Sequence, residues 1–163
     1  MNTGRTPLTL TQNTAGVPDT SETGDAFGSG VSLGDVNGDG YADLAIGASG
    51  ENSGAGSLTV LYGSASGLKT SGAKAYSQNT AGVPGAGEKS DRFGGRTTLV
   101  DHTGDRRAEL TVSAPGENAG DGAVWSLRGT TTGPTTSGAV SFGPSATDVA
   151  TTGSPGFGKT LGS

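Results

Sequence analysis

A long internal repeat constrains the fold of this chain more than any other feature of its sequence. Phe27-Gly28 recurs as Phe93-Gly94, Asp35 recurs as Asp101, and the Ala-Gly-Val-Pro segment at 15–18 recurs at 81–84, all at the same offset. Chains that repeat at such a period build copies of one supersecondary unit, and each unit buries an apolar face against the next. The repeat therefore predicts stacked units instead of one central core.

The composition agrees with many short strands joined by tight turns. Glycine accounts for 32 of the 163 residues, while hydrophobic residues make up 30% and aromatic residues 5%. Low hydrophobicity is also typical of disordered chains, but a disordered chain has no reason to keep its register from one unit to the next. Tight turns need glycine because it adopts positive φ without strain.

The apolar residues alternate with a period of two, and glycines bound each run. No window of helical length carries the apolar stripe of a helix. We therefore predict an all-β fold in which each unit is a four-stranded antiparallel sheet. The predicted strands lie near 29–35, 42–48, 57–63 and 73–78 in the first unit, and near 95–101, 108–114, 122–128 and 138–143 in the second.

The two ends of the chain do not coincide with unit boundaries. The segment 11–14 parallels 77–80, so we read 7–13 as the outer strand of a preceding unit. Phe157-Gly158 restarts the pattern of Phe93-Gly94. We therefore interpret 1–163 as a single stretch of repeat. It comprises the partial strand 7–13, complete units at 27–79 and 93–143, and a leading inner strand at 157–163.

Charge and cysteine content exclude several classes of function. The net charge is −5, and Arg106-Arg107 is the only basic cluster, so nucleic acid and acidic membranes are poor partners. The chain has no cysteine, which removes disulfides and thiol chemistry. No apolar run approaches the length of a membrane span. We see no signal-peptide pattern in this chain.

The segment 35–43, called here the first loop, has the pattern of a calcium-binding loop. Oxygen-bearing side chains stand at its positions 1, 3, 5 and 9, and glycine stands at position 6. Ca²⁺ prefers a flexible cage of several oxygen ligands. Three carboxylates so close together repel one another unless a cation is present, whereas a plain glycine turn would use Asp and Asn only to cap backbone N–H groups. The predicted ligands are Asp35, Asn37, Asp39 and Asp43 through side chains and Tyr41 through its backbone carbonyl.

The segment 101–109, called here the second loop, departs from this pattern. Arg106 replaces the glycine, although arginine disfavours the left-handed backbone expected there, and its charge is predicted to lie beside the carboxylates. An internal Arg–carboxylate network is the favoured reading, and a weak, degenerate calcium site is the alternative. The candidate ligands of that site are Asp101, Thr103, Asp105, Arg107 and Glu109.

These residues resemble the FG-GAP repeat of integrin α subunits and of secreted bacterial proteins. The resemblance rests on Phe27-Gly28, on the segment 34–44, on 47–50 and on 56–63, with a weaker copy that begins at Phe93-Gly94. It implies a β-propeller of four-stranded blades, with Ca²⁺ bound between the first two strands of a blade. Propellers typically close with four to eight blades, so two blades imply either a longer protein or an assembly of copies.

Other candidate sites have plainer explanations. His102 is the only histidine, and position 2 of such a loop points outward. The segment 153–160 fits a phosphate-loop pattern, but no helix follows it. Asp25 and Asp91, like Glu51 and Glu117, recur at the repeat offset. This recurrence favours structural roles over a hydrolytic pair of carboxylates.

We therefore expect a calcium-stabilised, non-enzymatic propeller module that acts in adhesion or assembly at the cell surface or outside the cell. Its partner would be a protein or a glycan. One alternative is an accessory or partial propeller of a secreted hydrolase. Another is a fragment whose unpaired terminal strands let copies complete one another's blades. The fold by itself does not identify which ligand such a module binds.

Overall fold

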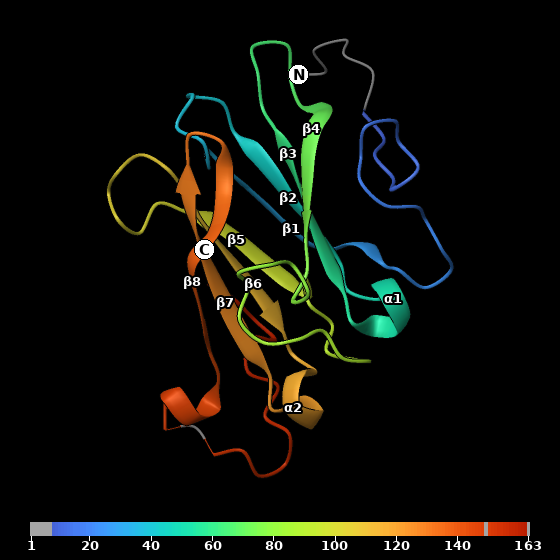
Figure 1. The fold of residues 1–163 in the computed structure, drawn as a ribbon, viewed down its shortest axis with the longest axis vertical. Coiled ribbons are helices and arrows are strands. Elements are labelled where there is room, and N and C mark those ends of the chain that lie inside the picture. Colours follow the sequence, from blue (N-terminus) through green and yellow to red (C-terminus); the bar gives the residue numbers. More distant parts are fainter. Residues whose placement is uncertain (1–7, 149, 163) are drawn as a thin grey trace, which may run out of the picture.

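The computed structural model describes residues 8–148 and 150–162, which form two four-stranded antiparallel sheets (Figure 1). Each sheet is a meander in which sequential strands pair, in the order β1-β2-β3-β4 and β5-β6-β7-β8. We call the sheets blade 1 and blade 2. Blade 1 comprises β1 (Phe27–Gly34), β2 (Asp43–Ala48), β3 (Ser57–Tyr62) and β4 (Lys69–Tyr76), and blade 2 comprises β5 (Arg96–Val100), β6 (Glu109–Ala114), β7 (Ala123–Thr130) and β8 (Gly133–Phe142).

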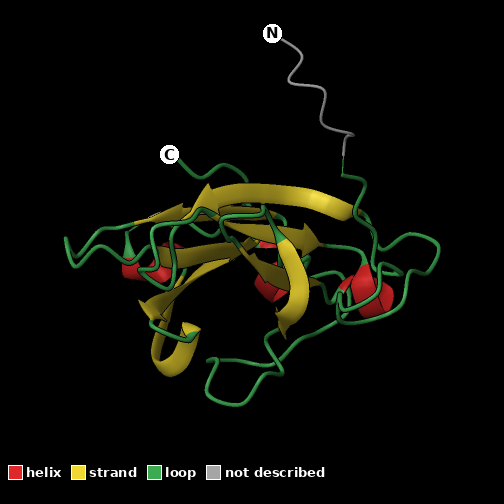
Figure 2. Ribbon diagram, turned by 90° about the horizontal axis from the view of Figure 1, so that it is seen from above, coloured by secondary structure: helices red, strands yellow, loops and turns green. Residues whose placement is uncertain are grey.

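The blade architecture predicted from the repeat is confirmed, with differences in detail. The outer strands β4 and β8 begin earlier than the apolar pattern indicates, because their first residues are largely polar yet still pair with β3 and β7. Two tight turns, α1 (Glu51–Gly54) and α2 (Glu117–Gly120), follow β2 and β6, and their two central residues have positive φ. A 3-10 turn, Pro144–Ala146, follows β8. Loops and strands otherwise dominate the described chain (Figure 2).

Each blade has two faces that alternate along its strands. Leu33 pairs with Leu44 across β1 and β2, and these side chains lie on what we call the front face. Ala45 pairs with Val60 across β2 and β3, and these lie on the back face. The period of two in the sequence thus separates two apolar surfaces within one sheet.

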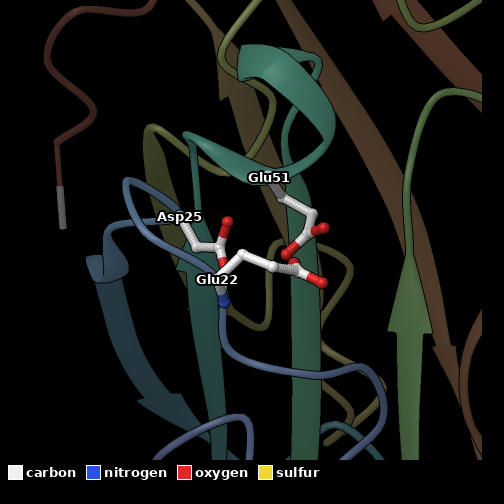
Figure 3. Close-up of side chains that lie close together, drawn as sticks. All are labelled: Glu22, Asp25 and Glu51. Carbon is white, nitrogen blue, oxygen red and sulfur yellow. Dashed lines mark hydrogen bonds between the residues drawn. The ribbon is translucent and has the colours of Figure 1, made fainter.

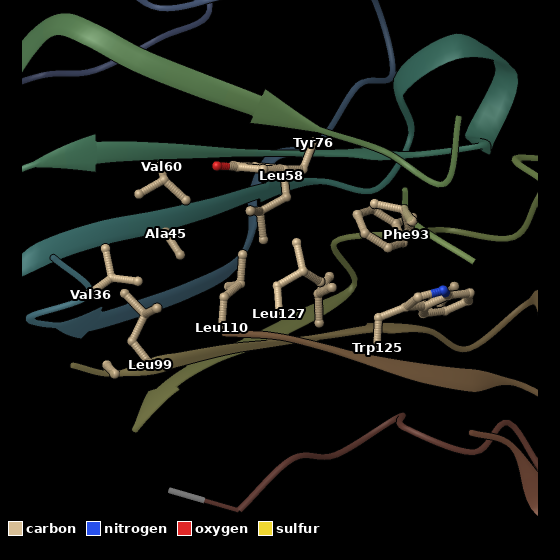
Figure 4. Packing of buried hydrophobic residues seen from close by; sticks show 14 of the residues in the cluster. Val36, Ala45, Leu58, Val60, Tyr76, Phe93, Leu99, Leu110, Trp125 and Leu127 are labelled. Carbon is tan, nitrogen blue, oxygen red and sulfur yellow. The ribbon is translucent and has the colours of Figure 1, made fainter. Parts of the chain in front are cut away.

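The main core lies between the back face of blade 1 and the front face of blade 2 (Figure 4). Ala45 and Val60 from blade 1 meet Leu99 and Leu110 from blade 2, and all four are buried. Phe93 and Trp125 pack edge to face with ring centroids 5.4 Å apart, a favoured aromatic geometry. Neither sheet could bury this surface alone.

The strands nearest each other in the two blades approach at glycine. β1 packs against β5, where the hydroxyls of Ser32 and Thr97 lie 2.9 Å apart. A methyl group added to Gly47 would overlap the carbonyl oxygen of Gly94. Glycine at position 47 is therefore required by the close contact between backbones.

The same docking contact occurs twice. The backbone N–H groups of Arg92 and Phe93 donate to the carbonyls of Gly54 and Ala55 at 2.8 and 3.0 Å. Those of Gly156 and Phe157 donate to Gly120 and Asp121 at 2.8 and 2.7 Å. These two acceptors stand one repeat beyond Gly54 and Ala55, so the segment after blade 2 meets blade 2 as blade 2 meets blade 1.

The terminal segments hold no strand in the described residues. Residues 8–13, part of the predicted outer strand 7–13, are irregular, and residue 7 lies outside the described chain. Residues 157–160 form a turn, residues 161 and 162 are irregular, and residue 163 is likewise outside the described chain. A strand is defined by the neighbouring strand with which it pairs, and neither segment has such a partner strand in the described part of the chain.

In the described ranges, no helix has the length and apolarity to cross a membrane. The two sheets of those ranges also do not close into a ring.

Candidate metal centre

The first loop joins β1 to β2 and is shaped by Asp35. Its carboxylate accepts backbone N–H groups of Gly38 at 2.7 Å, Asp39 at 3.1 Å and Gly40 at 2.7 Å. Gly40 has φ of +85°, as expected for the glycine of this turn. The backbone is thus wrapped around one carboxylate at the start of the loop.

The middle of the first loop is exposed and rich in oxygen atoms. The amide of Asn37 lies beside Asp39, with its Nδ2 donating to Oδ2 of Asp39 at 3.1 Å. The N–H of Tyr41 donates to Oδ1 of Asp39 at 2.9 Å. These contacts hold the predicted ligands within one turn of the chain.

Asp43 closes the first loop from inside the protein. It is fully buried, and its two oxygens accept N–H groups of Val36 at 2.9 Å and Gly63 at 2.8 Å. Burial raises the pKa of Asp43 above its usual value, the two N–H donors oppose this, and the charges of Asp39 and Asp35 raise it further. A cation beside the three carboxylates would relieve that repulsion.

The first loop supplies oxygen donors of the kind that a hard cation takes. Its three carboxylates do not reach the mutual spacing of 4.8 Å that Glu22, Asp25 and Glu51 reach in the described part of the chain. Each carboxylate oxygen that accepts one N–H keeps a second lone pair, and Asp35, Asp39 and Asp43 supply three charges. The stem of Arg107 from the second loop lies beside Gly38, but its guanidinium pairs with Asp105, and the described residues show no ion pair to a carboxylate of the first loop. These residues would hold the ion, and its charge would supply the cohesion that the carboxylates lack.

The second loop keeps the same backbone with different chemistry. Asp101 accepts N–H groups of Gly104 at 2.7 Å, Asp105 at 3.2 Å and Arg106 at 2.8 Å. Desolvation raises the pKa of Asp101, but the donors Arg106, Gly104 and Asp105 together outweigh it and hold the pKa below its usual value. Arg106 takes φ of +68°, the conformation that the sequence predicts arginine to resist.

The arginine that meets the carboxylates is Arg107, which corrects the role predicted for Arg106. Its Nη2 lies 2.8 Å from Oδ2 of Asp105, while Arg106 is exposed. Arg107 is half-buried, and its stem packs against Gly38 of the first loop. A guanidinium thus stands beside the position-5 carboxylate in the second loop and none does in the first.

Other candidate ligands of the second loop contact its backbone or its first aspartate. The hydroxyl of Thr103 donates to Oδ1 of Asp101 at 3.4 Å. Thr103 and His102 are exposed, and the N–H of His102 donates to Oε2 of the buried Glu109 at 2.9 Å. His102 therefore contributes a backbone contact.

A further group of carboxylates lies outside both loops. Oxygens of Glu22, Asp25 and Glu51 all lie within 4.8 Å of one another, and the three side chains converge in Figure 3. Sequence reasoning singled out Asp25 and Glu51 as recurrent carboxylates but missed Glu22. The recurrence of Glu22 as Glu88, at the offset of the repeat, was the available signal.

Comparison with known families bears on the first unit. The model of the FG-GAP repeat matches residues 27–61, which run from the start of β1 through the first loop into β3. This chain carries an FG-GAP repeat. The matched residues include all five predicted ligands of the first loop and Glu51. Blade 2 lies outside the match and shares with blade 1 the repeat offset and the strand order. No curated protein matches the chain.

Proposed function

We propose that this chain is a calcium-stabilised propeller module that serves adhesion or assembly outside the cell and catalyses no reaction. The observation that carries the proposal is the front-to-back docking of blade 2 on blade 1, with the same backbone contacts repeated by Gly156 and Phe157 on blade 2. Repetition of one docking operation generates a propeller.

Calcium binding in the first loop is supported by the contrast between the two loops. Both wrap three N–H groups around their first aspartate. The second loop then pairs Asp105 with Arg107, while Asp39 in the first loop has only neutral neighbours in its contacts. We assign the ion to the first loop, at Asp35, Asn37, Asp39, Tyr41 and Asp43.

A calorimetric melt tests the calcium loop. We expect Ca²⁺ to raise the melting temperature relative to EDTA, because an ion that binds only the folded state at 100 times its Kd adds about 2.7 kcal/mol. The shift should shrink in Asp39→Ala and persist in Asp105→Ala, which alters the corresponding residue of the second loop. Equal melts of the wild-type protein in Ca²⁺ and EDTA would contradict the proposal.

Self-assembly is a second candidate function, favoured by the exposed front face of blade 1. Val31 and Leu33 are largely exposed there, whereas Thr97 and Leu99 occupy the corresponding positions of blade 2 and are buried against blade 1. Another copy of the chain could cover that face. Light scattering over a concentration series should show association that Leu33→Lys weakens. A monomer at every concentration would remove this candidate.

The proposed ligand is a protein or a glycan that contacts the loops at the blade edges. Binding loops on a rigid scaffold are a common arrangement, and the acidic net charge disfavours nucleic acid as the partner.

A further inference from the structure

The carboxylates of Glu22, Asp25 and Glu51 form a compact group between the segment that precedes β1 and the turn that follows β2 (Figure 3). Glu22 and Asp25 lie in the turn that precedes β1, and Glu51 begins α1 after β2. Asp25 is 6% exposed and Glu51 2%, whereas Glu22 is exposed at the rim. The group is thus open to solvent on one side only.

Backbone contacts hold this geometry in place. The N–H of Glu22 donates to Oδ2 of Asp25, and the N–H of Gly50 donates to the carbonyl of Asp25 at 2.9 Å. Gly50 lies so close to the carbonyl of Gly24 that a methyl group there would overlap it. The two segments that supply the carboxylates are therefore tied to each other independently of any ion.

The negative charge of the group has no basic counterpart in the described part of the chain, whose one ion pair is Arg107–Asp105. Burial is the main cause that raises the pKa of Glu51. The bond from Gln12 opposes it, and Asp19, Asp25 and Glu22 raise it further. Carboxylates at such spacing repel one another, and a cation between them would relieve that repulsion.

Gln12 adds an independent observation that points to a cation. It is 3% exposed, and its Nε2 donates to Oε2 of Glu51 at 2.7 Å. Its Oε1 is buried and accepts no hydrogen bond from the described residues. Because both atoms belong to one planar amide, the unpartnered oxygen also lies in the neighbourhood of the Glu51 carboxylate. A buried carbonyl without a partner is destabilising.

We propose that Glu22, Asp25, Glu51 and Oε1 of Gln12 bind a Ca²⁺ ion at a site separate from the first loop. All four ligands are hard oxygen donors, and three carry charge, which is the donor set that Ca²⁺ selects. The ion satisfies the amide oxygen and neutralises the buried carboxylates. It also fastens residues 12–25 to the turn between β2 and β3.

The second unit offers an internal comparison. Nε2 of Gln78 donates to Oε2 of Glu117 at 2.6 Å, and Oε1 of Gln78 is again without a partner among the described residues. Nε2 of Gln78 also donates to the carbonyl of Ala86 at 3.2 Å, a bond that Gln12 does not share. The Gln–Glu pair therefore belongs to the repeat, while the close group of three carboxylates is found in the first unit.

Titration calorimetry with CaCl₂ in metal-free buffer near neutral pH tests the site. The background variant is Asp39→Ala, which silences the first loop. We expect this variant to bind one ion, and we expect Glu22→Gln added to it to weaken that binding at least about tenfold, because ligand charge sets calcium affinity. Glu22 is exposed, so its replacement should leave the fold intact, as circular dichroism would verify. Glu88→Gln in the same background is the matched control and should leave the binding unchanged.

Two results would overturn the inference. One is an Asp39→Ala variant that binds no ion while the wild-type protein binds one, which confines calcium to the first loop. The other is unchanged affinity after Glu22→Gln. If Asp39→Ala leaves all wild-type binding intact and Glu22→Gln abolishes it, the loop assignment fails and this site stands.

Discussion

At the scale of single residues, position 6 of the two loops shows how far a local rule extends. Gly40 and Arg106 both have positive φ, at +85° and +68°. The first aspartate of each loop imposes this conformation, because its carboxylate accepts the N–H of the position-6 residue in both loops. Arginine can adopt this backbone conformation, but its side chain makes the left-handed region cost about 1–2 kcal/mol.

Substitutions at these two positions should therefore change the free energy of unfolding in opposite directions. Arg106→Gly should stabilise the protein by about 1 kcal/mol, and Gly40→Ala should destabilise it by a similar amount. A methyl group at Gly40 meets no atom within 4 Å, so strain is the only cost there. Urea unfolding in EDTA measures both changes. If Arg106→Gly instead destabilised the protein, the contacts of the arginine side chain would stabilise the fold by more than the strain of its positive φ destabilises it.

At the scale of strands, the approach of β2 to blade 2 depends on the absence of a side chain. Gly47 lies against the backbone of Gly94, while Ser113 stands at the corresponding position of β6 and is buried beside Gly158. The two blades thus have the same topology, but the segment that follows blade 1 approaches β2 more closely than the segment that follows blade 2 approaches β6.

Gly47→Ala should force blade 1 and blade 2 apart. Insertion of a methyl group into a packed contact costs about 1–3 kcal/mol, and the obstacle here is backbone, which cannot rotate away. Chemical denaturation gives the change in free energy of unfolding, and quenching of Trp125 fluorescence reports whether the core between the blades has opened. An unchanged unfolding midpoint would contradict the observed contact.

At the scale of the whole molecule, the two blades expose corresponding residues differently. Leu33 in β1 is 62% exposed, and Leu99 at the same place in β5 is 6% exposed. The difference arises because blade 1 covers the front face of blade 2. Segment 8–18 reaches part of the front face of blade 1, where Leu10 and Val17 pack around Ile46.

Substitution of each leucine by alanine separates the stability that comes from burial between the blades from the stability that comes from the strand position itself. Leu99→Ala should destabilise the protein by about 2–5 kcal/mol, the range for buried leucines. Leu33→Ala should change stability by about 0.5 kcal/mol or less, as is usual for exposed positions. Both are measured by urea unfolding at low protein concentration, where copies stay apart. Equal losses would mean that blade stacking does not bury Leu99.

Much of the architecture could be predicted because it is encoded locally. Alternation of apolar residues located all eight strands, although β4 and β8 begin in polar segments that the pattern does not mark. The wrapped backbone of both loops also follows from neighbouring residues. The contact of Arg107 with Asp105 did not, because the direction of a side chain at the end of a turn depends on what packs against it.

The sequence by itself determined the repeat, the four-stranded unit and the first loop, since these rest on spacing and on interactions within a few residues. Only the tertiary structure decided which face of each sheet is covered, and that Glu22, Asp25, Glu51 and Gln12 meet. The physical reason is the separation along the sequence between the residues that interact. Turns and strand alternation are set by neighbours along the chain, whereas burial and convergence of charge depend on segments that docking brings together from far apart.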